Sequence, residues 1–251
     1  MTADVRTFDS EEELARAAAA YVGDCLRRAA EARGVATLAL AGGSTPRRLY
    51  ELLATDPWRR EAPWRQAEFF WGDERCVGPD DPASNYRMAR QALLSRLPLR
   101  PAQVHRMAGE LADAAAAAAA YEEHLRHFFQ HLGLQEPRFD LVLLGLGADG
   151  HTASLFPNHP ALREQERWVA AARLGGDGPS RLTLTYPVLN RAADILFLVT
   201  GAAKAETVRQ VLEGPRQPLR LPAQGVQPRA GRLTWFIERP AATRLSHLPL
   251  P

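Results

Sequence analysis

The chain has 251 residues, of which 46% are hydrophobic and 24% are charged. Both fractions are typical of soluble globular proteins, so they exclude a disordered, collagen-like or coiled-coil chain. The 31 basic and 29 acidic side chains give a net charge of +2 without a long basic block, which argues against nucleic acid as a partner.

The two cysteines, Cys25 and Cys76, are too few and too far apart for a disulfide framework or a CxxC metal site. The first residues are acidic where a signal peptide is basic, and no stretch approaches about 18 consecutive apolar residues. We therefore expect a cytoplasmic protein with no membrane partner, no metal and no cofactor. A monomer or a weak homodimer is predicted.

Short apolar runs alternate with helical stretches along the chain. The first helix is predicted from Ser10, which begins a capping box with Glu13, to Arg33 before Gly34. Strands are predicted at 36–41, 67–71, 139–144, 195–200 and 232–237, with helices at 46–54, 84–97 and around 114–120.

This alternation predicts an α/β fold with a mostly parallel, helix-covered sheet in a Rossmann-like three-layer arrangement. We expect residues 1–251 to form a single domain with a helical elaboration around residues 85–132. The stretch 214–228, rich in proline and glycine, is predicted to be a loop or a lid.

Ligands of such sheets bind beyond the carboxyl ends of the strands. One strand end carries Gly42, Gly43, Ser44 and Thr45, followed by Pro46 at the predicted first helical position. Glycines, hydroxyl groups and the free amides of a first helical turn favour a bound phosphate. The alternative is an ordinary turn in which Ser44 or Thr45 is the N-cap.

A second strand end carries the GxGxxG pattern of residues 145–150. A dinucleotide site is not expected, because the pattern is mid-chain and no acidic strand end follows about 20 residues later. We instead expect a glycine loop, including Gly150, that carries Asp149 and His151 to the strand ends. His151 is a candidate general base that Asp149 could orient; the alternative is a hydrogen-bonded loop histidine.

Charged residues follow two more predicted strands. Asp73 and Arg75 come after an apolar run, where they are either solvated loop residues or ligands of an oxyanion or phosphate. Lys204 is the only lysine and begins a helix, where a cation is disfavoured unless an anion binds there. Arg181 is a weaker candidate of the same kind.

Three histidines, His124, His127 and His131, lie at i, i+3 and i+7 on a predicted helix. This spacing spreads the rings, and no acidic residue completes a ligand set. We expect ordinary helix positions there and not a metal face.

Five motifs in order, AGGSTP, FFWGDERCVGPDDPASNY, FDLVLLGLGADGHTASLFP, RLTLTYPVLNRAADILFLVTGAAKAE and LPAQGVQP followed by GRLTWFIERPAA, resemble the 6-phosphogluconolactonases over nearly the whole chain. Small departures are Ala41, where a serine is common, and Asn158, where a glycine often stands. The resemblance implies a fold similar to glucosamine-6-phosphate deaminases and ribose-5-phosphate isomerases.

The activity implied by the resemblance is hydrolysis of 6-phospho-D-glucono-1,5-lactone in the oxidative pentose phosphate pathway. By the same resemblance, the turn of Gly43, Ser44 and Thr45 would hold the phosphate with Lys204 and Arg181, and His151 would activate water. Arg75 is expected to stabilise the oxyanion or the substrate, while Asp73 and Asp149 are expected to position hydroxyl groups or the imidazole.

Two other functions remain open at this point. Glucosamine-6-phosphate deaminases share Asp73, Asp149, His151 and Lys204, but they use an acid five residues after the histidine, where this chain has Phe156. A non-catalytic sugar-phosphate sensor could use the same anion site, although no basic recognition helix is evident.

Overall fold

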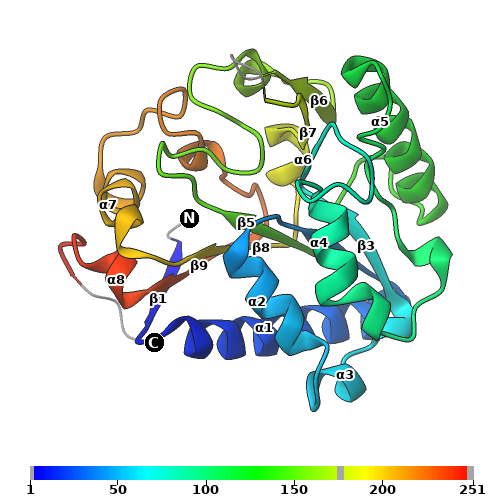
Figure 1. Cartoon of the computed structure of the whole chain (residues 1–251), viewed down its shortest axis with the longest axis horizontal. Helices are drawn as coiled ribbons and strands as arrows, with labels where there is room; N and C mark the ends of the chain where they lie inside the picture. The colour runs from blue at the N-terminus through cyan, green and yellow to red at the C-terminus, as the bar shows by residue number, and fades with distance from the viewer. Residues whose placement is uncertain (1–2, 174–177, 248–251) are drawn as a thin grey trace.

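Figure 1 shows the computed structural model of the chain, which describes residues 3–173 and 178–247. The strands are β1 (Asp4–Phe8), β2 (Ala36–Leu40), β3 (Ala67–Trp71), β4 (Asp73–Arg75), β5 (Leu141–Gly145), β6 (Val169–Ala172), β7 (Arg181–Leu184), β8 (Asp194–Val199) and β9 (Arg232–Glu238). The helices are α1 (Glu11–Arg33), α2 (Ser44–Leu53), α3 (Trp58–Glu61), α4 (Asn85–Ala92), α5 (Ala114–His131), α6 (Tyr186–Leu189), α7 (Ala205–Glu213) and α8 (Arg239–Ala242). Short 3-10 helices include Leu94–Arg96, Pro101–Gln103, Ala202–Lys204 and Pro222–Gly225.

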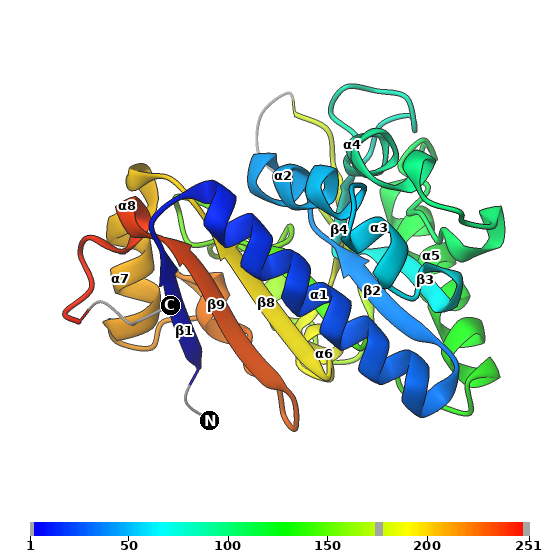
Figure 2. The same ribbon diagram turned by 90° about the horizontal axis from the view of Figure 1, so that it is seen from below.

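The main sheet has six strands in the order β1-β9-β8-β5-β2-β3, and all neighbouring pairs are parallel. β2 and β5 are neighbours within the sheet. After β2 the chain continues to β3 on one side of this pair, and after β5 it continues to β8 on the other side. Figure 1 places α1 on one side of this sheet and the smaller sheet with α5 and α6 on the other. Figure 2 shows α1 crossing the strands diagonally. The predicted α/β class with a helix-covered parallel sheet is confirmed.

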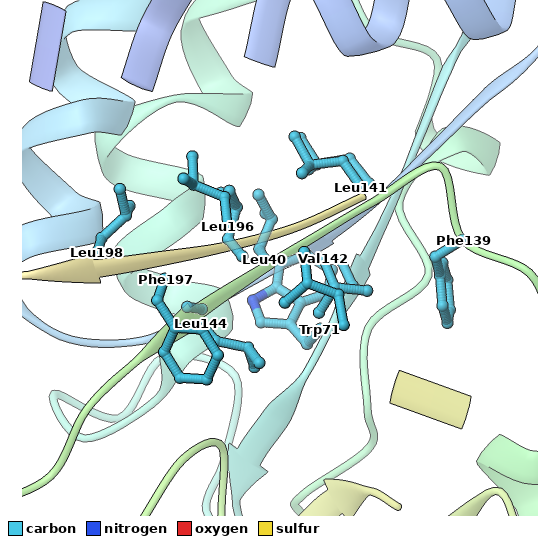
Figure 3. Packing of buried hydrophobic residues seen from close by; sticks show 14 of the residues in the cluster. Leu40, Trp71, Phe139, Leu141, Val142, Leu144, Leu196, Phe197 and Leu198 are labelled. Carbon is cyan, nitrogen blue, oxygen red and sulfur yellow. The ribbon is translucent and has the colours of Figure 1, made fainter. Parts of the chain in front are cut away.

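Apolar side chains on both faces of the central strands form the core. Leu196 and Leu198 lie on one side of β8 and Phe197 on the other, as expected for a strand covered on both faces (Figure 3). Phe197 stacks on Trp235 with 3.8 Å between the ring centroids. Burial of each large apolar side chain contributes about 1.5–3 kcal/mol. The core therefore holds the strand ends, and the loops that follow them, in fixed positions.

A second, three-stranded sheet was not predicted. Its order is β4-β7-β6, and both pairs are antiparallel. β4 consists of Asp73, Glu74 and Arg75, so these residues do not form the solvated loop that the sequence left open as one alternative: Glu74 is buried, and Asp73 has only 9% of its surface exposed. The polar residues form ladder hydrogen bonds with β7, which the sequence pattern does not show.

The predicted helix α1 is confirmed at both ends. Ser10 is the N-cap and accepts a hydrogen bond from the Glu13 amide at 3.2 Å. Gly34 follows the last turn with a φ of 74°, a left-handed conformation that favours glycine. The Glu13 carboxylate, however, accepts from the amide of Asp9 and not from that of Ser10.

Two other helix boundaries differ from prediction. α2 begins at Ser44, so Pro46 is the third helical residue and not the first, and Gly43 is the N-cap without a side-chain hydrogen bond. α4 ends at Ala92, and the predicted continuation toward residue 97 is a separate 3-10 helix, Leu94–Arg96. The expected helical elaboration around 85–132 is present as α4 and α5. Within the described residues, none of the helices combines the length and apolar character needed to cross a membrane.

Candidate active site

A cavity of about 340 Å³ lies beyond the carboxyl ends of β2, β3 and β5. The chain departs from β2 and β5 in opposite directions, and open α/β sheets bind ligands at such a point. The cavity brings together seven of the residues predicted from the sequence, namely Gly42, Gly43, Asp73, Arg75, His151, Arg181 and Lys204.

Four other predicted residues, Ser44, Thr45, Asp149 and Gly150, lie outside the lining. Ser44 and Thr45 begin α2 directly behind Gly43, and the Thr45 hydroxyl is 2.6 Å from that of Thr200 at the end of β8. The first turn of a helix has no intrahelical acceptor for its amides, so those of Ser44 and Thr45 are available to a ligand. Asp149 and Gly150 belong to the loop that carries His151, and Asp149 contacts the His151 ring.

Gly150 serves the conformation of the loop that carries His151. Its φ is 84°, and a Cβ added there would come within 2.7 Å of the Leu221 side chain. Gly147 is needed for a similar reason, because its Cβ would lie 2.0 Å from the His151 ring. Both glycines allow the tight turn that places the imidazole at the cavity.

His151 is oriented by Asp149. Its Nδ1 lies 2.6 Å from the Asp149 carboxylate, which also accepts the His151 amide at 3.2 Å. A carboxylate only accepts, so Nδ1 carries a proton, and in the neutral imidazole Nε2 is then left with a lone pair. Burial alone would raise the pKa of Asp149, but the hydrogen bonds and charge of His151 hold that pKa below its usual value.

Arg75 and Arg181 form a cationic pair on the small sheet. They are cross-strand partners in β4 and β7, and both line the cavity. In the described part of the chain, the Nε atom of each is buried without a hydrogen-bond partner. Burial, and then the charge of Arg75, lower the pKa of Arg181. Two adjacent guanidinium groups with unused donors are an arrangement that an anion would stabilise.

Lys204 adds a third cation to the lining of the cavity. It ends the 3-10 helix Ala202–Lys204 and is the N-cap of α7. Both the ammonium group and the N-terminus of α7 are positive, so the position favours an anionic ligand, as the sequence predicted.

Comparison with known proteins assigns the chain to a family. The family described as glucosamine-6-phosphate isomerases/6-phosphogluconolactonase matches residues 9–235. A protein of Synechocystis sp. named 6-phosphogluconolactonase is 41% identical over 245 residues, covering 98% of this chain and 99% of that protein. The chain belongs to this family.

Solved structures agree with the assignment. The 6-phosphogluconolactonase of Trypanosoma cruzi superposes with a TM-score of 0.85 at 29% identity, covering 98% of this chain and 99% of that chain. A monomeric glucosamine-6-phosphate deaminase superposes with a TM-score of 0.80 at 23% identity, covering 96% and 99%, and this shows the shared fold alone. The resemblance stated from the motifs is therefore confirmed at the level of the family.

One position bears on the two activities in the family's name. Phe156 lines the cavity, and its ring centroid lies 4.6 Å from that of His151, tilted by 42°. The side chain five residues after the histidine is thus next to the imidazole and is apolar. No proton can be exchanged between this phenyl ring and the histidine.

Sequence reasoning missed two polar residues of the cavity, Asn85 and Ser154. Both donate to the Asp73 carboxylate, Asn85 at 3.2 Å and Ser154 at 2.6 Å. Glu74, also missed, accepts the amides of Asn85 and Tyr86 and so fixes the start of α4. Burial raises the pKa of Glu74 although these hydrogen bonds oppose the shift. The motif SNY at residues 84–86 was the available signal, but only as part of the family resemblance.

The predicted loop or lid at 214–228 is held by hydrogen bonds. The Gln224 side chain donates to the carbonyls of Gln210 and Pro215 and accepts from the Gln217 amide. The Ala223 amide donates to the Gly150 carbonyl at 2.9 Å. This segment therefore packs against the loop of His151 and supports it.

The three helix histidines do not converge. The His124 ring hydrogen-bonds to His105 at 2.7 Å, and His105 in turn contacts Glu68 at 3.0 Å. Among residues 3–173 and 178–247, no group of three or more His, Cys, Asp or Glu side chains is arranged to hold a metal ion.

Proposed function

We propose that the protein hydrolyses 6-phospho-D-glucono-1,5-lactone to 6-phosphogluconate, the lactonase step of the oxidative pentose phosphate pathway. Family membership and the names of its relatives support this assignment. The observation that carries it is an imidazole with one nitrogen fixed by a carboxylate, in a cavity that also contains three cationic side chains.

His151 is the general base of the proposed reaction. Nε2 takes a proton from a water molecule as the water oxygen attacks C1 of the lactone. When the bond between C1 and the ring oxygen breaks, the imidazolium returns the proton to that oxygen, and histidine is regenerated. A lactone is an activated ester, so an oriented water, a base and oxyanion donors suffice without a covalent nucleophile.

The three cationic side chains would bind different groups of the substrate. The turn of Gly42, Gly43, Ser44 and Thr45 would hold the phosphate together with Lys204 and Arg181, and Arg75 would stabilise the oxyanion at C1. In the lactone, the ring oxygen joins C1 to C5, and C5 carries the carbon that bears the phosphate, so the two ends are only a few bonds apart. Neighbouring arginines can therefore contact both ends of one substrate. Asp73 would position a hydroxyl group.

The alternative within the family is a glucosamine-6-phosphate deaminase. Phe156 argues against it, because an acid next to the histidine is what those enzymes use for ring opening. The test is a pH-stat assay with freshly generated lactone, corrected for spontaneous hydrolysis, with ammonia release from glucosamine 6-phosphate measured in parallel. Acid release is expected. Ammonia release would favour the deaminase, and ligand-induced stabilisation without turnover would favour a sugar-phosphate sensor.

Replacing Lys204 tests the phosphate site. Lys204→Ala removes a charge-assisted contact, which costs about 1.5–3 kcal/mol, mainly as weaker substrate binding. We expect the variant to lose its preference for the phosphorylated lactone over D-glucono-1,5-lactone, measured as the ratio of the two kcat/KM values. An unchanged ratio would remove Lys204 from the phosphate site.

A further inference from the structure

The Asp73 carboxylate connects three segments that line the cavity. One oxygen accepts from the Asn85 side chain at 3.2 Å, and the other accepts from the Ser154 hydroxyl at 2.6 Å. Asp73 belongs to β4, Asn85 begins α4, and Ser154 follows His151 in the same loop. Both carboxylate oxygens are therefore already bonded within the protein, and their direction in the cavity is fixed.

Asn85 makes a second contact on its other side. A Cβ built on Gly42 would lie 2.0 Å from the Asn85 side-chain oxygen, so the carboxamide occupies the space beside this glycine. The Asn85 nitrogen also donates to the backbone carbonyl of Asp73 at 2.9 Å. The carboxamide thus lies between the turn at the end of β2 and the Asp73 carboxylate, in contact with both.

The backbone position of Asn85 is fixed by the buried Glu74 carboxylate. Glu74 accepts the amide of Asn85 at 2.8 Å and the hydroxyl of Ser84 at 3.0 Å. Asn85 and Glu74 each have only 2% of their surface exposed. A buried side chain whose nitrogen and whose backbone amide are both hydrogen-bonded is restricted to one rotamer, so it can hold a distance between two loops.

We propose that Asn85 is a positioning residue that sets the distance between the anion-binding turn at Gly42 and the Asp73 carboxylate. Through Ser154 this carboxylate is bonded to the loop of His151. Asn85 thereby aligns the end of the substrate that carries the phosphate with the end where water attacks. The inference rests on the proposed lactonase function and adds a residue to it.

The distinctive consequence concerns substrate preference. If the two ends are no longer aligned, the phosphate can still bind, but its binding no longer places C1 correctly at His151. A small misplacement of this kind can lower the rate by about 100-fold. D-glucono-1,5-lactone has no phosphate to anchor, so its hydrolysis loses less.

The experiment compares kcat/KM for the phosphorylated and unphosphorylated lactones in Asn85→Ala and in Asn85→Ser. We expect the ratio of the two values to fall by about 10-fold to 100-fold in both variants. The affinity for 6-phosphogluconate, measured by calorimetry, is expected to fall as well. The serine variant keeps a residue that starts helices well and guards against a folding failure of the alanine variant.

Two further variants separate alignment from general damage. Gln103→Ala removes another buried carboxamide, which donates to the carbonyls of Trp64 and Ala67 away from the cavity, so stability should fall without a change in the ratio. Ser154→Ala breaks the same chain of contacts at its other end, between Asp73 and the loop of His151, so the ratio should fall there in the same direction as in the Asn85 variants.

Three outcomes decide the matter. A selective loss for the phosphorylated lactone supports the proposal. The proposal would be overturned if the Asn85 variants lost kcat/KM equally for both lactones and lost as much stability as Gln103→Ala. If the wild type hydrolyses neither lactone, the proposed function fails, and the calorimetric affinities then decide whether Asn85 shapes the anion site.

Discussion

The two sides of the cavity satisfy their charges differently. On the histidine side, His151 is paired with Asp149 at 2.6 Å, and its loop is bonded to the 214–228 segment. On the arginine side, Arg75 and Arg181 keep buried Nε donors that have no partner among the described residues. The charge on the histidine side is paired within the protein, whereas neither arginine forms an ion pair with a described residue.

This difference separates chemistry from binding. The proposed base must be held in one orientation and one tautomer before substrate arrives, and the Asp149 contact does this for His151. Partly buried cations without a counterion carry an unfavourable desolvation free energy, which a bound anion offsets. Substitutions on the histidine side should therefore change kcat, and on the arginine side the substitution of Arg181, which is proposed to bind the phosphate, should change KM.

The largest effect is expected from His151→Ala. General base catalysis contributes about 100-fold to 10,000-fold, so kcat should fall by at least about two orders of magnitude with a modest change in KM. Steady-state assays with freshly generated lactone measure both constants. Near-normal turnover would remove His151 from its role and would end the proposed division between the two sides.

A smaller effect, on the other constant, is expected from Arg181→Ala. Loss of a charge-assisted hydrogen bond to the phosphate costs about 1.5–3 kcal/mol, which corresponds to a rise in KM of about 10-fold to 100-fold. A matched control is Arg173→Ala, which removes an arginine from the neighbouring strand region outside the cavity lining. If Arg181→Ala lowered kcat and left KM unchanged, the arginine side would belong to the chemistry.

The main sheet could be predicted from the sequence because its central strands are continuous apolar runs. Residues 36–40 and 194–199 are buried along their whole length, and short apolar runs between helices are typical of parallel strands covered on both faces. The small sheet could not be predicted in this way. β4 is Asp-Glu-Arg, whose composition is typical of a solvated loop, and it forms a strand only because β7 pairs with it.

The candidate site divides along the same line. Residues in loops directly after predicted strands, such as Lys204 and His151, were accessible to sequence reasoning because topology alone brings strand ends together. Asn85 and Ser154 were not, since their importance lies in contacts to Asp73 across 12 and 81 residues of chain. Whether a buried polar side chain faces a cavity depends on tertiary packing, which no local pattern records.

Asp149→Asn tests how the histidine side is prepared. The amide can still occupy the space, but it brings no charge and can donate to Nδ1, which would place the imidazole proton on Nε2. We expect kcat to fall by about 10-fold or more, in the range of one lost charge-assisted hydrogen bond, with KM little changed. Asp113→Asn, at the exposed N-cap of α5, serves as a control for loss of a carboxylate. Equal activity of the two variants would show that orientation by Asp149 is unimportant.

The smallest effect concerns a histidine that is paired with another histidine and not with a carboxylate. Burial, and then the charges of His105 and His127, lower the pKa of His124. Below about pH 6.5 the unfolded chain therefore binds a proton at this position that the folded chain resists, so stability is lost as the pH falls from that value. His124→Gln should reduce the difference between thermal midpoints at pH 7.5 and pH 5.5 by about 1–2 °C. His131→Gln, on the same helix, should leave that difference as in the wild type, and an equal change in both variants would show that the contact between His105 and His124 does not sense pH.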